Sequence, residues 1–208
     1  SAMAERAPRR ALVAGAGIAG LAAAAALARA GWAVTVFDRV RAFGEVGAGL
    51  QMSPNAARVL SWLGLLDRLR GAAVAPEAAE LRDGQTGQPF FRTTLGERAR
   101  HRWGAPYLHL HRADLHAALR AAAREAGAEI VPATPVTGYA HRPEGVRLTL
   151  ADGTVETGQL LIGADGIRSA LRTALNGPEA SAFAGQVAWR GTLPAEAAPE
   201  GMRRARAT

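Results

Sequence analysis

The 208-residue sequence contains no cysteine. It also contains no lysine, and all 25 of its basic residues are arginine. Without cysteine the chain has no disulfide, no thiolate nucleophile and no cysteine metal site. Without lysine it has neither the phosphate-binding lysine of a Walker motif nor an amine for Schiff-base chemistry. These absences exclude several common enzyme classes, and we expect no metal site.

Aromatic residues are also scarce, at 5% of the chain, although the formal charge is +7. A basic balance of this size ordinarily suggests a nucleic-acid partner. Here the arginines are scattered singly among alanines, and few aromatic residues accompany them. We interpret the arginine content as a compositional habit of the source genome and expect no nucleic-acid partner.

The most informative stretch begins with a short apolar run at 12–14 and continues as Gly15-Ala16-Gly17-Ile18-Ala19-Gly20. After an alanine-rich segment, a second apolar run at 33–37 ends on Asp38, 18 residues past Gly20. A strand, a Gly-x-Gly-x-x-Gly turn opening a helix, and a second strand ending on a carboxylate form a Rossmann dinucleotide site.

Each part of this pattern has a physical role. Gly15 allows the tight turn, Gly17 lets a pyrophosphate approach the backbone, and Gly20 lets the helix pack closely on the strand. Unpaired N–H groups at the helix start, around Ile18 and Ala19, attract the phosphates. Asp38 would accept hydrogen bonds from the adenosine ribose, and the predicted site also includes the next residue, Arg39.

The same region has an alternative interpretation. Residues 11–28 carry no charge, follow three arginines and precede Ala28-Arg29-Ala30, which is the outline of a secretory signal or a short membrane span. Alanine and glycine drive membrane insertion weakly, however, and a signal peptide has no use for a following strand that ends on Asp38. We therefore favour the dinucleotide site, with no membrane partner and a cytoplasmic location. Ser1-Ala2-Met3 is interpreted as an expression remnant.

Hydrophobic periodicity predicts alternating elements of an α/β fold. A turn at Asp83-Gly84-Gln85-Thr86-Gly87 predicts a hairpin, and an Asp152-Gly153 turn predicts an antiparallel meander. Ser53-Pro54 predicts a helix start, with Leu66 as the last apolar residue on one side of that helix. The remaining helices are expected at 18–30, 113–126 and 167–175. Strands are expected at 11–14, 33–37, 78–81, 89–93, 107–110, 129–131, 136–140, 146–150, 154–157, 160–163 (buried) and 186–193.

Three further segments add candidate residues. The stretch from Gly47 to Ala56 contains Gly49 and by itself reads as a glycine loop leading into a capped helix. In His111-Arg112-Ala113-Asp114-Leu115, the acid suits the first turn of a helix, while Arg112 could reach the phosphates or ribityl chain of a cofactor. In Gly163-Ala164-Asp165-Gly166-Ile167-Arg168-Ser169, Asp165 is either a helix N-cap or a ligand-binding residue at the carboxyl end of a strand.

Together, in this order, these segments resemble the FAD-dependent aromatic hydroxylases, the single-component flavoprotein monooxygenases, and most closely their salicylate hydroxylase-like branch. The resemblance implies a Rossmann-type FAD-binding domain of the glutathione-reductase-like kind, with antiparallel β insertions and the start of a substrate-domain sheet. It implies that Arg112 contacts FAD and that Gly49 belongs to the cofactor site. It also implies a role toward FAD and a transient NADH or NADPH for Asp165, Gly166 and Arg168. Asp38 stands where members more often have Glu.

The implied reaction is hydroxylation of a small aromatic substrate, such as a phenol or hydroxybenzoate, with NAD(P)H and O2. Catalytic residues remain unassigned, since His109, His111 and His116 suit structural or peripheral roles. The implied organisation is a lead at 1–10, an FAD-binding domain at 11–75 and 104–177, and a partial substrate domain at 76–103 and 178–208.

The sequence departs from the family pattern in one respect, because it contains no Gly-Asp dipeptide, which members carry downstream. The resemblance therefore implies an N-terminal portion of such a hydroxylase. Two alternatives stay open: a non-catalytic dinucleotide-binding fragment, and a flavin-dependent reductase or oxidase that shares the FAD fold. The sequence does not reveal the oligomeric state or the choice between NADH and NADPH.

Overall fold

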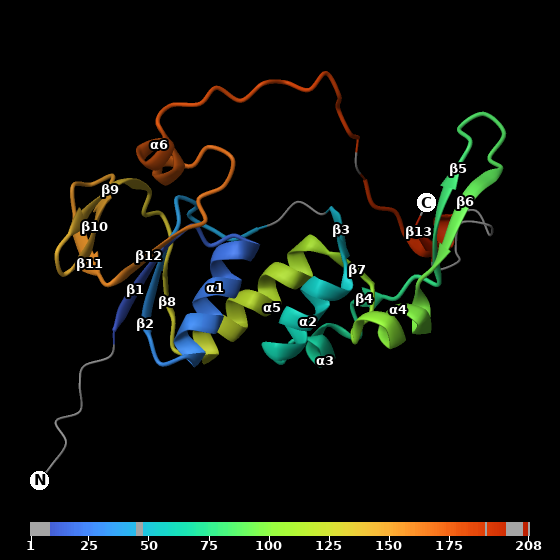
Figure 1. Cartoon of the computed structure of the whole chain (residues 1–208), viewed down its shortest axis with the longest axis horizontal. Coiled ribbons are helices and arrows are strands. Elements are labelled where there is room, and N and C mark those ends of the chain that lie inside the picture. Colours follow the sequence, from blue (N-terminus) through green and yellow to red (C-terminus); the bar gives the residue numbers. More distant parts are fainter. Residues whose placement is uncertain (1–8, 45–47, 190, 199–205, 208) are drawn as a thin grey trace, which may run out of the picture. The chain divides into compact units, whose positions relative to one another are not determined.

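The computed structural model describes residues 9–44, 48–189, 191–198 and 206–207 (Figure 1). The expression remnant at 1–3, Gly47 of the glycine loop and Arg190 of the last predicted strand lie outside the described residues. The chain divides into two compact units, which are described one at a time. The first unit contains residues 1–44 and 119–186, and the second contains 45–118 and 187–208. The domain boundaries expected from the sequence stay a prediction.

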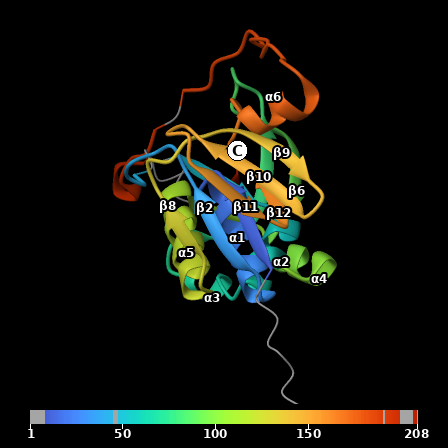
Figure 2. The ribbon, with the colours of Figure 1, turned by 90° about the vertical axis from the view of Figure 1, so that its left-hand side faces the viewer.

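The first unit is built on a four-stranded parallel sheet (Figure 2). Its strands are β12 (Leu160–Gly163), β1 (Arg10–Ala14), β2 (Ala33–Phe37) and β8 (Glu129–Val131), in that order. In the register, Leu12 of β1 lies between Thr35 of β2 and Leu161 of β12. The two central strands bury nearly every residue, as strands covered on both faces do. The prediction of a Rossmann-type fold is confirmed at this level.

Helix α1 (Ile18–Arg29) connects β1 to β2 and packs against both strands. It consists almost entirely of small residues, and its buried side is formed by Gly20, Leu21, Ala24 and Ala25. Small side chains allow a helix to approach a sheet closely, so this connection stays short and tight. The strand–helix–strand start predicted at 11–37 is therefore confirmed almost to the residue.

An antiparallel meander packs on the face of the parallel sheet opposite to α1 (Figure 1). It consists of β9 (Val136–Arg142), β10 (Gly145–Leu150) and β11 (Val155–Gly158). Its tight turn forms at Asp152, which accepts a hydrogen bond from the Thr154 N–H at 2.8 Å, as predicted. The shared core unites Leu12, Ala14, Phe37, Leu148, Leu150 and Leu171, the last from helix α6 (Ala170–Asn176).

The second unit contains two small sheets. One has β7 (Leu108–His111) between β3 (Gly49–Met52) and β4 (Ala73–Val74). The other is the predicted hairpin of β5 (Ala78–Arg82) and β6 (Pro89–Thr94), with β13 (Arg206–Ala207) parallel to β5. Its helical segments are α2 (Pro54–Trp62), α3 (Leu66–Leu69), α4 (Gly96–Trp103) and the 3-10 turn Ala195–Ala197. Helix α5 (Arg112–Glu125) follows β7 and contributes residues to both units.

A buried carboxylate stabilises the hairpin. The Glu80 side chain is 2% exposed and accepts hydrogen bonds from Arg82, whose Nη2 lies 2.6 Å from Oε2. Arg92 on the neighbouring strand places Nη1 3.2 Å from Oε1. At the tip, the Asp83 carboxylate accepts from the Thr86 N–H at 2.7 Å, and this hydrogen bond lowers the pKa of Asp83. Side-chain bonds thus fix both the register and the turn.

Several predicted elements differ from the structure. The described residues between 186 and 193 form no strand, so the prediction of a strand there is wrong. The strand at 160–163 forms, but it is half-exposed rather than buried, because it lies at the edge of its sheet. The helix through Leu66 is split, since Gly64 adopts a left-handed φ of 74° and ends the first part.

Candidate functional site

The first and third glycines of the motif lie directly against neighbouring backbone. Gly15 has a φ of 102°, and its N–H donates to the Phe37 carbonyl at 2.7 Å. A Cβ on Gly15 would lie 2.2 Å from the carbonyl oxygen of Ala164. A Cβ on Gly20 would lie 1.8 Å from the Gly15 carbonyl oxygen. These two positions therefore require glycine for reasons of space, as the sequence predicts.

Gly17 differs from its neighbours because an added Cβ would meet nothing within 4 Å. It is the N-cap of α1, and the first helical bond runs from the Leu21 N–H to the Gly17 carbonyl at 2.9 Å. The N–H groups of Ile18 and Ala19 precede that bond and so belong to the open end of the helix. The first turn of α1 contains no acidic residue. An open space beside a positive helix end fits a phosphate group.

Asp38 follows β2 and points its carboxylate at this turn. Its Oδ2 accepts a hydrogen bond from the Ala16 N–H at 2.6 Å, and its Oδ1 accepts from the Val40 N–H at 2.8 Å. The side chain is half-buried, whereas Arg39 beside it is exposed. Each carboxylate oxygen keeps a second acceptor position, so a ribose hydroxyl could still bind.

The segment after β12 lies beside the glycine turn, because the Cα of Asp165 would be 3.0 Å from a Cβ on Gly15. The Asp165 carboxylate accepts from the Ser169 hydroxyl at 2.5 Å and from the Leu171 N–H at 3.3 Å. Ser169 is the N-cap of α6, and its Oγ accepts from the Arg172 N–H at 2.9 Å. Asp165 thus supports the start of α6 by binding its N-cap residue. This role is close to the interpretation of Asp165 as a helix N-cap, although Ser169 is the cap itself.

This network also explains why α6 starts at Ala170 and not at Ile167. Gly166 has a left-handed φ of 82°, so the backbone between β12 and the cap residue Ser169 is not helical. Gly166, Ile167 and Arg168 precede the helix, and all three are exposed on the surface of this turn. Gly166 and Arg168 therefore lie on an accessible loop next to the glycine turn.

The two remaining predicted site residues belong to the second unit and lie together there. Gly49 pairs with His111 in the register of β3 and β7. Arg112 follows immediately, and its N–H donates to the Ala48 carbonyl at 2.9 Å. The segment interpreted as a loop thus becomes a strand at Gly49, and its pairing with β7 brings Gly49 and Arg112 to the same strand end.

Sequence reasoning missed the residues that hold the Asp38 turn in place. Ala133 adopts a left-handed φ of 54°, and its N–H donates to the Val40 carbonyl at 2.8 Å. The Thr134 N–H donates to the Asp38 carbonyl at 2.7 Å. Pro132 and Pro135 flank this turn in the sequence, but no local pattern indicates that it pairs with the segment after β2.

The three histidines of β7 and α5 differ in their surroundings. His109 is half-buried, its Nε2 has no hydrogen-bond partner among the described residues, and burial lowers its pKa. His111 accepts a hydrogen bond at Nδ1 from the Ala113 N–H at 3.3 Å. His116 is buried in α5. These positions agree with structural roles for His111 and His116 and leave His109 as a neutral side chain at pH 7.

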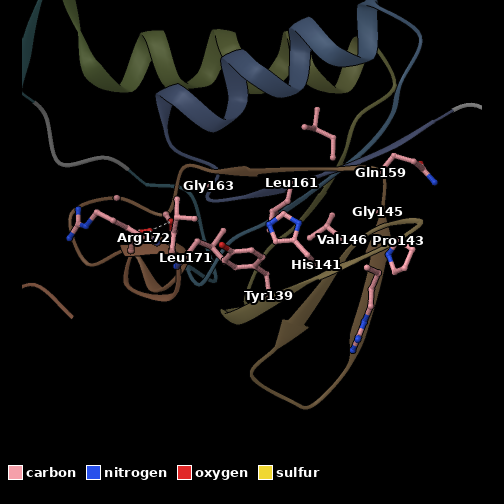
Figure 3. A pocket seen from close by; sticks show the side chains of 16 residues that line it. Tyr139, His141, Pro143, Gly145, Val146, Gln159, Leu161, Gly163, Leu171 and Arg172 are labelled. Atoms are coloured by element: carbon pink, nitrogen blue, oxygen red, sulfur yellow. Dashed lines mark hydrogen bonds between the residues drawn. The ribbon is translucent and has the colours of Figure 1, made fainter. Parts of the chain in front are cut away.

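A pocket of about 790 Å³ lies in the first unit between the meander, β12 and α6 (Figure 3). Figure 3 shows Tyr139 and His141 on the meander side and Leu171 on the helix side. Among the predicted site residues, only Asp165 and Gly166 line it. The pocket is therefore distinct from the open space beside Gly17.

The parallel sheet, the glycine turn and the carboxylate after β2 define a dinucleotide-binding domain. A family described as "FAD binding domain" matches residues 9–203. The chain belongs to this family, and its recognition as related to the FAD-dependent aromatic hydroxylases is confirmed. FAD is the cofactor that the family binds.

Known proteins that the chain resembles support this assignment. It is 43% identical over 198 residues to a 3-amino-4-hydroxybenzoate 2-monooxygenase of Streptomyces platensis, covering 92% of this chain and 48% of that protein. The solved structure of tetrameric 2-methyl-3-hydroxypyridine-5-carboxylic acid oxygenase matches with a TM-score of 0.71 and 34% identity, over 82% of this chain and 43% of the other.

A third relative was solved with the cofactor. The structure of Klebsiella pneumoniae HpxO complexed with FAD and uric acid matches with a TM-score of 0.69 and 30% identity, over 79% of this chain and 41% of the other. The chain thus spans about half the length of the curated relatives it matches. Within the described ranges, no helix has both the length and the apolar content needed to cross a bilayer.

Proposed function

We propose that the turn between β1 and α1 holds the ADP half of FAD, in a protein that hydroxylates small aromatic compounds with NAD(P)H and O2. The observation that carries this proposal is the open side of Gly17, where nothing lies within 4 Å of an added Cβ. Gly15 and Gly20 are closed by backbone, so the open one of the three motif glycines is Gly17, at the helix N-terminus.

In this proposal, the N–H groups of Gly17, Ile18 and Ala19 bind the pyrophosphate, and Asp38 accepts from the adenosine ribose. Arg39 is exposed beside Asp38 and adds positive charge near the phosphates. Gly166 and Arg168, on the loop after β12, contribute to the same site. Asp165 acts through its bonds to Ser169 and Leu171, which fix that loop.

Gly49 and Arg112 of the second unit are the two further residues that we propose for FAD binding. Arg112 begins α5 directly after β7, and its backbone is anchored on Ala48. An arginine fixed at a strand end presents several N–H donors in a rigid fork, which suits phosphate or ribityl oxygens. We assign no acid–base pair to the reaction.

Bound FAD supplies the redox chemistry, since a flavin can take up a hydride from NAD(P)H and react with O2. The part played by this chain's own residues is to bind the cofactor, orient it and exclude water from it. The substrate class rests on relatives whose names specify hydroxybenzoate or hydroxypyridine compounds. We propose a phenol or hydroxybenzoate as the substrate, a cytoplasmic location and no nucleic-acid partner.

The experiment has two stages. First, the purified 208-residue chain is dialysed against FAD, and the flavin absorbance retained in excess over the free side is measured. We expect saturable retention; a chain that retains no flavin at saturating FAD overturns the cofactor assignment for these residues. Second, NAD(P)H oxidation by the longest natural form of the protein is measured with and without a panel of hydroxybenzoates. Stimulation supports hydroxylation, whereas flavin binding without stimulation favours a reductase, an oxidase or a non-catalytic module.

A further inference from the structure

The carboxylate of Asp38 is already engaged by the protein. One oxygen accepts from the Ala16 N–H at 2.6 Å and the other from the Val40 N–H at 2.8 Å. The Ala16 contact joins residues 22 positions apart, across the ends of β1 and β2. Hydrogen bonds to an ionised carboxylate are shorter and stronger than those between neutral groups.

The backbone of Asp38 is fixed independently of this contact. Its N–H donates to the Val131 carbonyl at 3.1 Å, and its carbonyl accepts from the Thr134 N–H at 2.7 Å. Val40 is held as well, because its carbonyl accepts from the Ala133 N–H at 2.8 Å. The end of β2 is therefore a rigid platform, and the Asp38 side chain reaches from it to the glycine turn.

The glycine turn has few side-chain contacts of its own. Between Gly15 and Gly20 the sequence supplies two alanines and one isoleucine, and α1 has no side chain that caps its N-terminus. Glycine-rich backbone loses more conformational freedom on ordering than any other, so a turn of this composition needs an external anchor. The Ala16–Asp38 bond provides a charged anchor in the middle of the turn.

We propose that Asp38 is a positioning residue that orders the glycine turn before any nucleotide binds, in addition to a contact with the ribose. The ligand part of this inference rests on the proposed FAD site. A turn that is ordered in advance spares the ligand the cost of ordering it, which increases affinity for every phosphate-containing ligand of the site. The short Asp38 side chain reaches the Ala16 N–H directly at 2.6 Å, and the added methylene of a glutamate would displace the carboxylate from this position.

Two nucleotides separate the positioning role from a contact with ribose alone. ADP carries both ribose hydroxyls, and 2′,3′-dideoxy-ADP carries neither. Binding of each to the wild-type chain and to Asp38→Asn is measured by calorimetry. We expect Asp38→Asn to lose about ten-fold in affinity for 2′,3′-dideoxy-ADP, the equivalent of one charge-assisted hydrogen bond, and at least as much for ADP, which also loses the ribose contact. A loss seen with ADP and absent with 2′,3′-dideoxy-ADP assigns Asp38 to the ribose alone and overturns the proposal.

The chain offers a matched control in Asp152. This residue also accepts a bond from the N–H two positions later, Thr154 at 2.8 Å, but it lies in the turn between β10 and β11. Asp152→Asn therefore removes the charge from the same type of local bond without touching the glycine turn. We expect its affinity for both nucleotides to equal that of the wild type, and a similar loss in this variant would contradict a specific role for Asp38.

Amide hydrogen exchange tests the same inference without any ligand. In the nucleotide-free wild type we expect protection of the Ala16 amide, and about ten-fold faster exchange in Asp38→Asn and in Asp38→Glu. The Leu21 amide, bonded to the Gly17 carbonyl, serves as the internal reference for a folded helix. Unchanged Ala16 exchange in both variants overturns the proposal. Failure of the wild type to bind ADP would instead contradict the proposed function, and the exchange measurement would still decide the role of Asp38.

Discussion

Gly15 and Ala164 approach so closely that a single carbon atom on Gly15 would lie 2.2 Å from the Ala164 carbonyl oxygen. The contact joins the glycine turn after β1 to the segment after β12. Gly15→Ala should therefore destabilise the first unit by about 3 kcal/mol, because backbone cannot yield as a flexible side chain can and the φ of 102° is strained for alanine. Urea denaturation followed by circular dichroism measures the loss, and stability equal to the wild type would contradict the described turn.

Gly17→Ala gives the opposite combination of effects. A Cβ here meets nothing within 4 Å and φ is −75°, so the free energy of unfolding should change by no more than about 1 kcal/mol. The added methyl group would occupy the space proposed for the pyrophosphate. FAD affinity, measured by quenching of flavin fluorescence, should fall at least about ten-fold, equivalent to roughly 1.4 kcal/mol. Undiminished FAD binding would place the phosphates elsewhere.

The buried Glu80 should stabilise the hairpin of the second unit. Glu80→Gln removes the charge that pairs with Arg82 and Arg92, and we expect a loss of about 2–3 kcal/mol, because both arginines keep some contact with water. Glu97→Gln is the matched control, since the Glu97 side chain is 95% exposed and 3.7 Å from Arg100. That variant should stay within about 0.5 kcal/mol of the wild type. Equal effects in a thermal denaturation assay would mean that burial of Glu80 has no energetic consequence.

His109 should make the stability depend on pH. Burial lowers its pKa in the folded chain below the ordinary value of 6.5, so the unfolded chain binds more protons as the solution becomes acidic. The contribution of His109 is complete above pH 6.5 and is lost as pH falls through 6.5 toward the folded pKa. His109→Gln should therefore show a flatter stability profile between about pH 8 and about pH 5 than the wild type. The control variant is His101→Gln, which replaces an exposed histidine of α4 by the same residue type.

The elements predicted correctly from the sequence depend on local patterns. The start at 11–37 alternates between apolar strands and a small-residue helix. In the two turns, the Asp83 and Asp152 side chains accept hydrogen bonds from backbone N–H groups only two or three positions later. Helix α4 was not predicted, because its sequence is dominated by arginine and offers few apolar residues to reveal a period. The apolar residues around Trp189 suggested a strand, yet that side chain is 94% exposed and has no partner strand among the described residues.

In the candidate site, too, the features with a local sequence pattern were predictable and those that depend on tertiary contacts were not. The spacing of Gly15, Gly17 and Gly20 identifies the turn, and the structure shows that a Cβ would collide with backbone at Gly15 and Gly20 but would meet nothing within 4 Å at Gly17. The spacing could not reveal that Asp38 contacts the Ala16 N–H, because that bond depends on how β1 and β2 pair. Nor could it decide between the two interpretations of Asp165, since the bond to Ser169 depends on where α6 begins.

In the proposed function, the first unit recognises the ADP half of FAD. Calorimetric titration of the 208-residue chain with FAD, ADP and FMN tests it most directly, because FMN lacks the adenosine and the second phosphate. We expect FAD and ADP to bind, and FMN to bind at least about a hundred-fold more weakly, equivalent to roughly 2.7 kcal/mol. Binding of FMN as tight as that of FAD, together with no binding of ADP, would contradict it.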